Sequence, residues 1–211
     1  MVPIQELTYF ALAALMLVLS PGPNMVYLIS RSITQGRNAG LVSLAGLMCG
    51  FLFHIFMVAF GLTAVLYAVP HAFTVIQVLG VIYLLYLAYQ AVKPNGKPLF
   101  EANTTLANDP PARLFKIGVI TTMLNPKVAV FYLSLFPYFI KPEYGSVFLQ
   151  SIQLGLTQVS ISASINFLIV LSASQVARFF ANNPTWVKVQ KWVMASVLVG
   201  MAIKMALSAA E

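Results

Sequence analysis

The sequence contains very little charge. Only 8% of its 211 residues are Asp, Glu, Lys or Arg, whereas soluble domains carry about 25%. Five acidic and twelve basic residues cannot cover the surface of a water-soluble protein of this size, which argues against a cytosolic enzyme, a nucleic-acid-binding module and a disordered chain. The net charge of +7 reflects the shortage of acids rather than a basic patch. Because 60% of the residues are hydrophobic, we expect an all-α integral membrane protein.

Cysteine is almost absent as well. Cys49 is the single cysteine, so the chain cannot form an internal disulfide or a cysteine metal cage. No Asp or Glu falls deep within an apolar stretch, and this scarcity of acids and thiols argues against selective binding of a metal cation. We therefore expect no metal, no cofactor and no nucleic-acid partner.

Long stretches without charge set the expected spans. A helix needs about 20 apolar residues to cross the hydrocarbon core, and 24 residues without charge separate Glu6 from Arg31. The whole chain, 1–211, is expected to form one transmembrane domain. The expected helices cover about 7–30, 40–68, 72–92, 115–140, 146–174 and 187–207.

Lysine and arginine are distributed unevenly between the loops. The three loops on one side carry nine of them, whereas the other side carries only Lys141 and, near the C-terminus, Lys204. The positive-inside rule places the nine in the cytoplasm, so both termini are expected to be periplasmic.

The two halves of the chain resemble each other. A shift of 105 residues aligns Pro21 with Pro126 and Tyr27 with Tyr132, among nine identities over residues 8–52. With three helices per copy, the second copy must enter the membrane from the opposite side. We therefore expect two inverted three-helix repeats, about 7–92 and 115–207, joined by a cytoplasmic loop at about 93–114.

Proline interrupts the first and fourth expected helices. The motifs are Ser20-Pro21-Gly22-Pro23-Asn24 and Asn125-Pro126-Lys127. Because proline lacks a backbone donor, these breaks should free the carbonyls of Leu17, Leu19 and Thr122. Non-helical backbone at membrane depth occurs only within protein or beside water, so both breaks should line a cavity.

Each motif also predicts the start of a new half-helix. Ser20 and Asn125 occupy equivalent positions in the alignment, and both residue types are preferred N-caps before a proline at the first helical position. Helix N-termini favour anions, and the freed carbonyls suit an ammonium. The combination predicts a site for a zwitterionic amino acid.

Two ionisable residues lie within the expected spans. Lys127 lies near mid-membrane, where a lysine costs about 3 kcal/mol; it could bind a substrate carboxylate, take part in ion coupling, or serve as a structural clip on the freed carbonyls. His54 shares a helical stripe with the small-residue pair Gly46 and Gly50. It could relay protons or contact substrate, or it could form an interhelical hydrogen bond. The small-residue face could serve packing within the protomer or a homo-oligomer.

The fifth expected helix has a polar face. Gln158, Ser162 and Asn166 follow one another at intervals of four residues, which places them on one side of a helix. They could form a wall of an aqueous pathway that binds substrate, or they could hydrogen-bond between helices.

These motifs resemble the lysine exporter/homoserine-threonine efflux family, the LysE/RhtB type. The resemblance rests on the two proline motifs, on Phe115-x-x-Gly118 before the second one, and on Gly50-x-x-x-His54 with Gly61-Leu62. It extends over essentially the whole chain. It implies a bacterial inner-membrane exporter of amino acids or related metabolites, driven by the proton gradient. The implied site residues are Pro21, Gly22, Pro23, Asn24, Asn125, Pro126 and Lys127.

The chain departs from the family at one position. Many members carry an acid in the fifth helix, where this sequence has Ser162. A cationic substrate would need a buried counter-charge, so we expect small neutral amino acids of the homoserine, threonine or leucine kind, with His54 or Lys127 as candidates for proton coupling. The alternatives are a transporter of a metal cation or other ion, and a membrane-embedded Ser/His hydrolase. A hydrolase is disfavoured because no Gly-x-Ser-x-Gly motif is present, and we expect a protein that is not an enzyme.

Overall fold

The computed structural model is helical throughout the residues that it describes: 1–19, 22–68, 108–175 and 183–208, with Phe179 and short pieces of 78–93. The elements are α1 (Ile4–Leu19), α2 (Pro23–Thr34), α3 (Arg37–Ala68), α5 (Pro111–Met123), α6 (Pro126–Phe139), the 3-10 turn η1 (Pro142–Tyr144), α7 (Val147–Leu171) and α9 (Pro184–Ser208). Most of the expected span at 72–92 lies outside the described residues, and Ser20 and Pro21 lie outside them as well.

Length and hydropathy identify the helices that could cross a bilayer. Within the described residues, the segments Arg37–Gly61 of α3 and Val147–Leu171 of α7 qualify singly, and α1 with α2 and α5 with α6 qualify as bent pairs. α9 covers the expected stretch 187–207 but carries Lys188, Lys191 and Lys204, and it is not among them. Two to four spans are thus supported by these criteria, against six expected.

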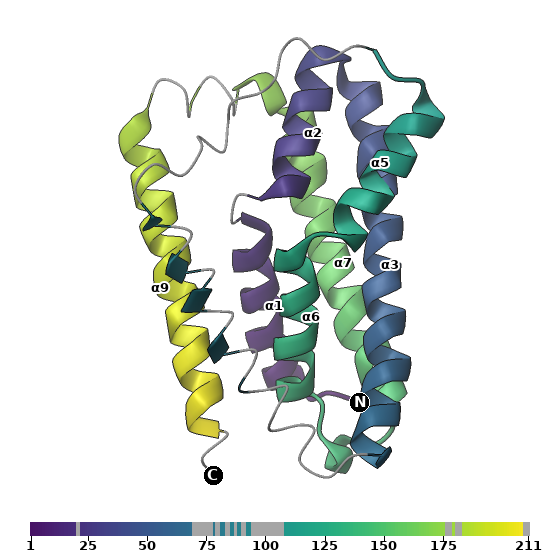
Figure 1. The fold of residues 1–211 in the computed structure, drawn as a ribbon, viewed down its shortest axis with the longest axis vertical. Coiled ribbons are helices and arrows are strands. Elements are labelled where there is room, and N and C mark those ends of the chain that lie inside the picture. Colours follow the sequence, from purple (N-terminus) through teal and green to yellow (C-terminus); the bar gives the residue numbers. More distant parts are fainter. Residues whose placement is uncertain are drawn as a thin grey trace.

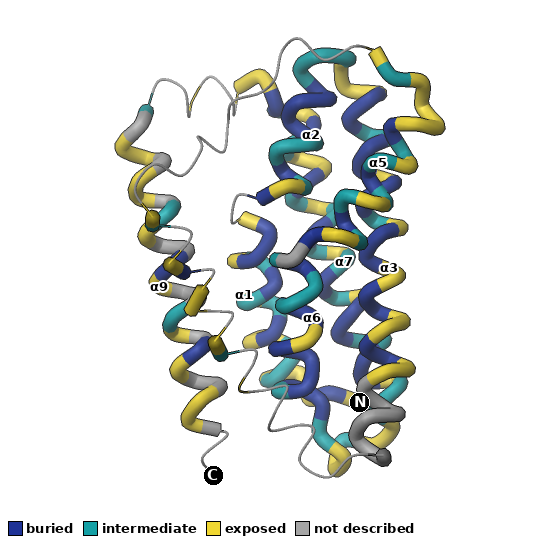
Figure 2. The backbone as a smooth tube through the Cα atoms, in the orientation of Figure 1, coloured by how far each residue is buried: buried dark blue, intermediate teal, exposed yellow. Residues whose placement is uncertain are grey.

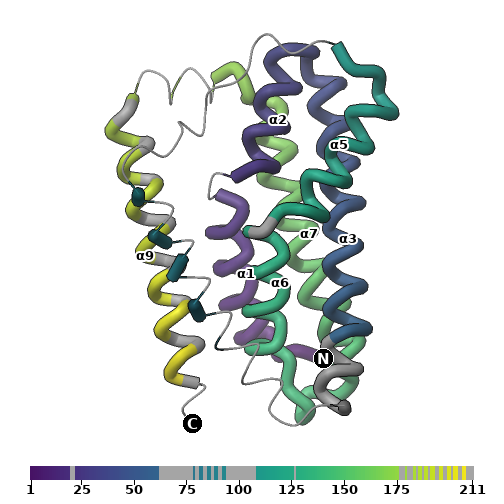
Figure 3. The backbone as a smooth tube through the Cα atoms, in the orientation of Figure 1, coloured from purple at the N-terminus to yellow at the C-terminus, as the bar shows by residue number. Residues whose placement is uncertain are grey.

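The two bent pairs run in opposite directions. α1 and α2 meet at an angle of 53°, and α5 and α6 meet at 49°. α1 contacts α6, and α2 contacts α5, so the breaks lie at similar depth and each pair is followed by a long helix, α3 or α7 (Figures 1 and 3).

Glycines allow α3 and α5 to pack at very close range. A Cβ atom on Gly46 would lie 2.2 Å from the carbonyl oxygen of Phe115, and one on Gly118 would lie 2.6 Å from the carbonyl oxygen of Ser43. No side chain fits there without separating the helices. Gly46 and Gly118 therefore serve packing within the protomer.

Aromatic packing joins α1 to α6. The ring of Phe10, which is fully buried, makes edge contacts with Phe136 and Phe139 at centroid distances of 5.4 Å. Buried residues are concentrated where α1, α2, α3, α5, α6 and α7 face one another (Figure 2). α9 lies to one side of them, where Ala195 packs against Ala88.

One end of the bundle carries a buried ion pair. Arg31 at the end of α2 and Asp109 before α5 are 2.5 Å apart, and each side chain is 9% exposed. Arg113 lies 3.1 Å from the same carboxylate, and Gln35 donates to the Asp109 backbone carbonyl. One of the five acids of the chain thus ties α2 to α5 at the end opposite Lys141 (Figure 1).

Candidate functional site

The second break has the predicted geometry. Asn125 is the N-cap of α6 with an extended backbone, and its side-chain oxygen accepts from the backbone N–H of Lys127 at 3.0 Å. Pro126 occupies the first turn of the helix, where its missing N–H costs nothing. A new half-helix begins here, as the sequence predicted.

The first break differs from the prediction by two residues. α2 begins at Pro23 with Gly22 as its N-cap, rather than at Pro21 with Ser20 as the cap. The reason is local: a residue that precedes proline is disfavoured in the α region, so Gly22 stays extended (φ −173°) and the helix starts after it. Gly22 lies against the end of the Lys127 side chain, since a Cβ atom there would lie 2.9 Å from the Lys127 amine and would make that flexible side chain shift.

Asparagines connect the two breaks. Asn125 donates through Nδ2 to Oδ1 of Asn24 at 2.9 Å, and Asn24 donates through its own Nδ2 to Oγ1 of Thr122 at 3.2 Å. The predicted residues of the two halves therefore meet, although 101 positions separate Asn24 from Asn125.

Lys127 also bridges the breaks. Its side-chain nitrogen donates to the carbonyl of Leu17 at 3.1 Å. That carbonyl lies four residues before Pro21, so it is one of those expected to lose its helical donor. The contact fits a structural clip, and it also places an ammonium group beside a carbonyl acceptor at the centre of the bundle.

His54 is held by the second break. It is 5% exposed, and its Nε2 lies 3.0 Å from the carbonyl of Thr122, the acceptor expected to be freed by Pro126. A carbonyl accepts only, so this contact requires the proton on Nε2. The geometry is that of the interhelical hydrogen bond considered from the sequence.

The polar face of α7 is buried and internally bonded. Gln158 donates through Nε2 to Oγ of Ser162 at 3.0 Å, and Asn166 donates through Nδ2 to the Ser162 carbonyl at 2.9 Å. Tyr132 of α6 donates its phenol to Oε1 of Gln158 at 2.6 Å. Tyr132 was not among the predicted site residues, and its only signal in the sequence is the alignment with Tyr27.

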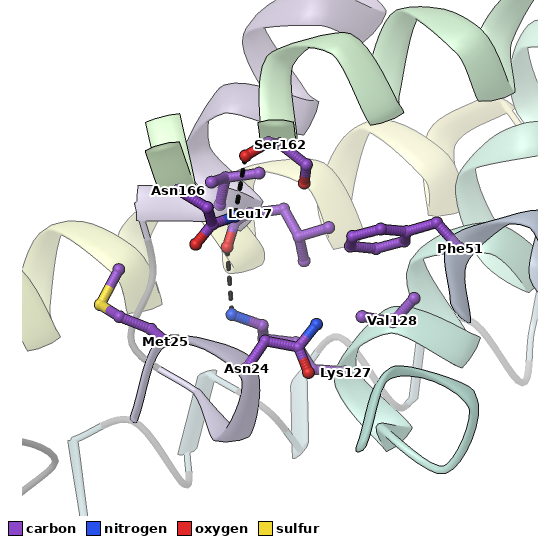
Figure 4. Close-up of a pocket in the computed structure, with 9 residues that line it drawn as sticks. Leu17, Asn24, Met25, Phe51, Lys127, Val128, Ser162 and Asn166 are labelled. Atoms are coloured by element: carbon purple, nitrogen blue, oxygen red, sulfur yellow. Dashed lines mark hydrogen bonds between the residues drawn. The ribbon is translucent and has the colours of Figure 1, made fainter. Parts of the chain in front are cut away.

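A small cavity lies between the two breaks and the polar face of α7 (Figure 4). Its volume of about 20 Å³ is enough for about one water molecule and too small for an amino acid. Of the predicted residues, Asn24, Lys127, Ser162 and Asn166 line it, whereas Gln158 lies behind Ser162 and His54 is not in the lining. The remaining lining residues are apolar: Leu17, Val18, Met25, Phe51 and Val128.

Comparison with known sequences assigns the family. The sequence model of the LysE type translocator matches residues 15–209. The chain belongs to this family. LysE-type proteins are transporters rather than enzymes, and the apolar helices of this one agree with a multi-pass inner-membrane protein.

Relatives of this LysE-type chain span nearly its full length. An uncharacterized membrane protein of Vibrio cholerae is 30% identical over 93% of this chain and 94% of the relative. A leucine efflux protein of Klebsiella pneumoniae is 28% identical over 95% and 93%, and one of Salmonella typhimurium is 25% identical over 93% and 92%. These relatives indicate an amino-acid exporter. No solved structure matches the chain.

Proposed function

We propose that this LysE-type translocator is a secondary transporter that exports small neutral amino acids, of the leucine, homoserine or threonine kind, across the bacterial inner membrane. The observation that carries the proposal is the bond from the Lys127 amine to the Leu17 carbonyl beside the cavity. This pair offers one cationic donor and one neutral acceptor, which are the groups that a zwitterion needs.

A zwitterion can replace the Lys127–Leu17 bond with two bonds. Its carboxylate accepts a charge-assisted hydrogen bond from the Lys127 amine, and its ammonium donates to the Leu17 carbonyl. Both buried groups of the protein stay paired in the loaded site, which avoids the cost of an unsatisfied buried polar group. A ligand with only one of the two ends forms only one of these two bonds.

The other lining residues favour a neutral substrate. None of them is acidic, so a cationic side chain would find no counter-charge. Asn166 donates through Nδ2 to the Ser162 carbonyl, so its Oδ1 remains as a second acceptor for the ammonium. Met25, Phe51 and Val128 offer apolar surface for a short hydrocarbon side chain.

The cavity must enlarge to admit this substrate. The two bent pairs cross the same depth in opposite directions, and this agrees with inverted repeats that rock against each other around a central site. The surplus of Lys and Arg at one end favours an orientation with the Arg31–Asp109 end in the cytoplasm and both termini in the periplasm.

Proton coupling belongs to Lys127 rather than to His54. Lys127 lines the cavity, whereas His54 does not line it and donates through Nε2 to the carbonyl of Thr122. A His54→Gln protein should therefore still respond to an imposed pH difference. Lys127→Met, which has no ionisable group, should not.

Counterflow in proteoliposomes tests the function. Vesicles loaded with unlabelled leucine should accumulate labelled leucine, and external leucine, homoserine and threonine should compete. Leucinamide lacks the carboxylate and 4-methylpentanoate lacks the amine, so neither should compete. Competition by either single-ended analogue would contradict the two-ended site. Counterflow of lysine or of a metal ion alone would contradict the substrate class.

A further inference from the structure

A chain of hydrogen bonds runs from Tyr132 to the cavity wall. The phenol of Tyr132 donates to Gln158, and the amide of Gln158 donates to the hydroxyl oxygen of Ser162. All three side chains are at most 1% exposed. Tyr132 and Gln158 do not line the cavity, but Ser162 does (Figure 4).

The two distances indicate which atom donates in each of these hydrogen bonds. The contact between Tyr132 and Gln158 is 2.6 Å, which is short and typical of O–H···O, whereas the contact between Gln158 and Ser162 is 3.0 Å, which is typical of N–H···O. If the amide were flipped, its NH2 would face the phenol and its oxygen would face Ser162, and both lengths would be less usual. Gln158 therefore presents its NH2 group to Ser162.

The direction decides what Ser162 can do. Its oxygen accepts from Gln158, so its own hydrogen is left to donate, and none of the described residues accepts that hydrogen. Ser162 is 1% exposed and lines the cavity with Lys127 and Asn24. A hydroxyl whose hydrogen is uncommitted suits an anionic acceptor.

We propose that Tyr132 is a positioning residue: through Gln158 it fixes the Ser162 hydroxyl as a hydrogen-bond donor to the substrate carboxylate. This inference rests on the proposed function and adds the second donor of the carboxylate site beside Lys127.

Three variants test this series of hydrogen bonds. Ser162→Ala removes the donor to a charged acceptor, so the half-saturation concentration for leucine in counterflow should rise roughly tenfold with little change in maximal rate. Tyr132→Phe frees the Gln158 amide to turn, so it should shift half-saturation in the same direction. Because both act through the same hydroxyl, the double variant should be no worse than Ser162→Ala.

Ser151→Ala is the matched control. Ser151 lies on the same helix, is fully buried, and donates to the carbonyl of Val147 away from the cavity. It should leave half-saturation unchanged. Additive effects of Tyr132→Phe and Ser162→Ala, or a wild-type half-saturation in Ser162→Ala, would overturn the inference while leaving leucine export in place. Absence of leucine counterflow in the wild type would overturn the proposed function, and the inference with it.

Discussion

Replacement of Lys127 by Met separates a binding role from a structural clip. The substitution keeps an unbranched side chain that is one atom shorter, and it removes the charge and the donors. A lysine near mid-membrane costs about 3 kcal/mol, and this cost disappears. The Leu17 carbonyl loses its bond to the amine, at a cost of about 1–3 kcal/mol. Because these terms are comparable and opposite, we expect the folded protein to be about as stable as the wild type.

Transport should respond quite differently. Truncating one partner of a buried charge pair costs about 2–5 kcal/mol of binding, so leucine counterflow should fall at least about thirtyfold. The assays are thermal melting in detergent, followed by size-exclusion chromatography, and counterflow with the same preparation. Lys116→Met is the control, since it removes an exposed lysine eleven residues earlier in the chain. A Lys127→Met protein that melts several degrees lower and transports normally would show that Lys127 is only a clip.

Other substitutions probe the surrounding structure. Gly46→Ala places a methyl group against the Phe115 carbonyl and should cost about 1–3 kcal/mol of stability. Gly61→Ala is the control, because open space surrounds Gly61, and it should leave the melting temperature unchanged. Equal melting temperatures of the two variants would contradict the close α3–α5 contact. Asn125→Ala should lose about 1 kcal/mol as an N-cap and about 1 kcal/mol for its bond to Asn24, measured by melting against Asn108→Ala, which changes an exposed asparagine, and a wild-type value would refute the cap. Asp109→Asn leaves the buried Arg31 charge without its carboxylate and should lower stability by about 3 kcal/mol; unchanged melting would show that the pair is solvated.

The sequence predicted what depends on local chemistry. A proline removes a donor wherever it lies, so the breaks and the freed carbonyls of Leu17 and Thr122 could be predicted without a structure. The wrong prediction for the start of α2 also has a local cause. Pro23 disfavours a helical backbone at Gly22, and this effect outweighed the preference for a serine cap.

Contacts between distant segments could not be predicted in this way. Lys127 could be predicted as a clip on one of the freed carbonyls, but the sequence does not indicate that its partner is Leu17, 110 positions earlier. Tyr132 lies in an apolar helix among phenylalanines, and its role depends on its contact with Gln158 of α7. The polar face of α7 was visible from its spacing, but the direction of its hydrogen bonds needed atomic positions.

An experimental structure with leucine bound is the most direct test of the two-ended site. We predict a carboxylate oxygen about 2.7–2.9 Å from the Lys127 amine, the leucine ammonium on the Leu17 carbonyl, and no remaining bond between Lys127 and Leu17. A structure in which Lys127 still donates to Leu17 while leucine lies elsewhere would contradict the account.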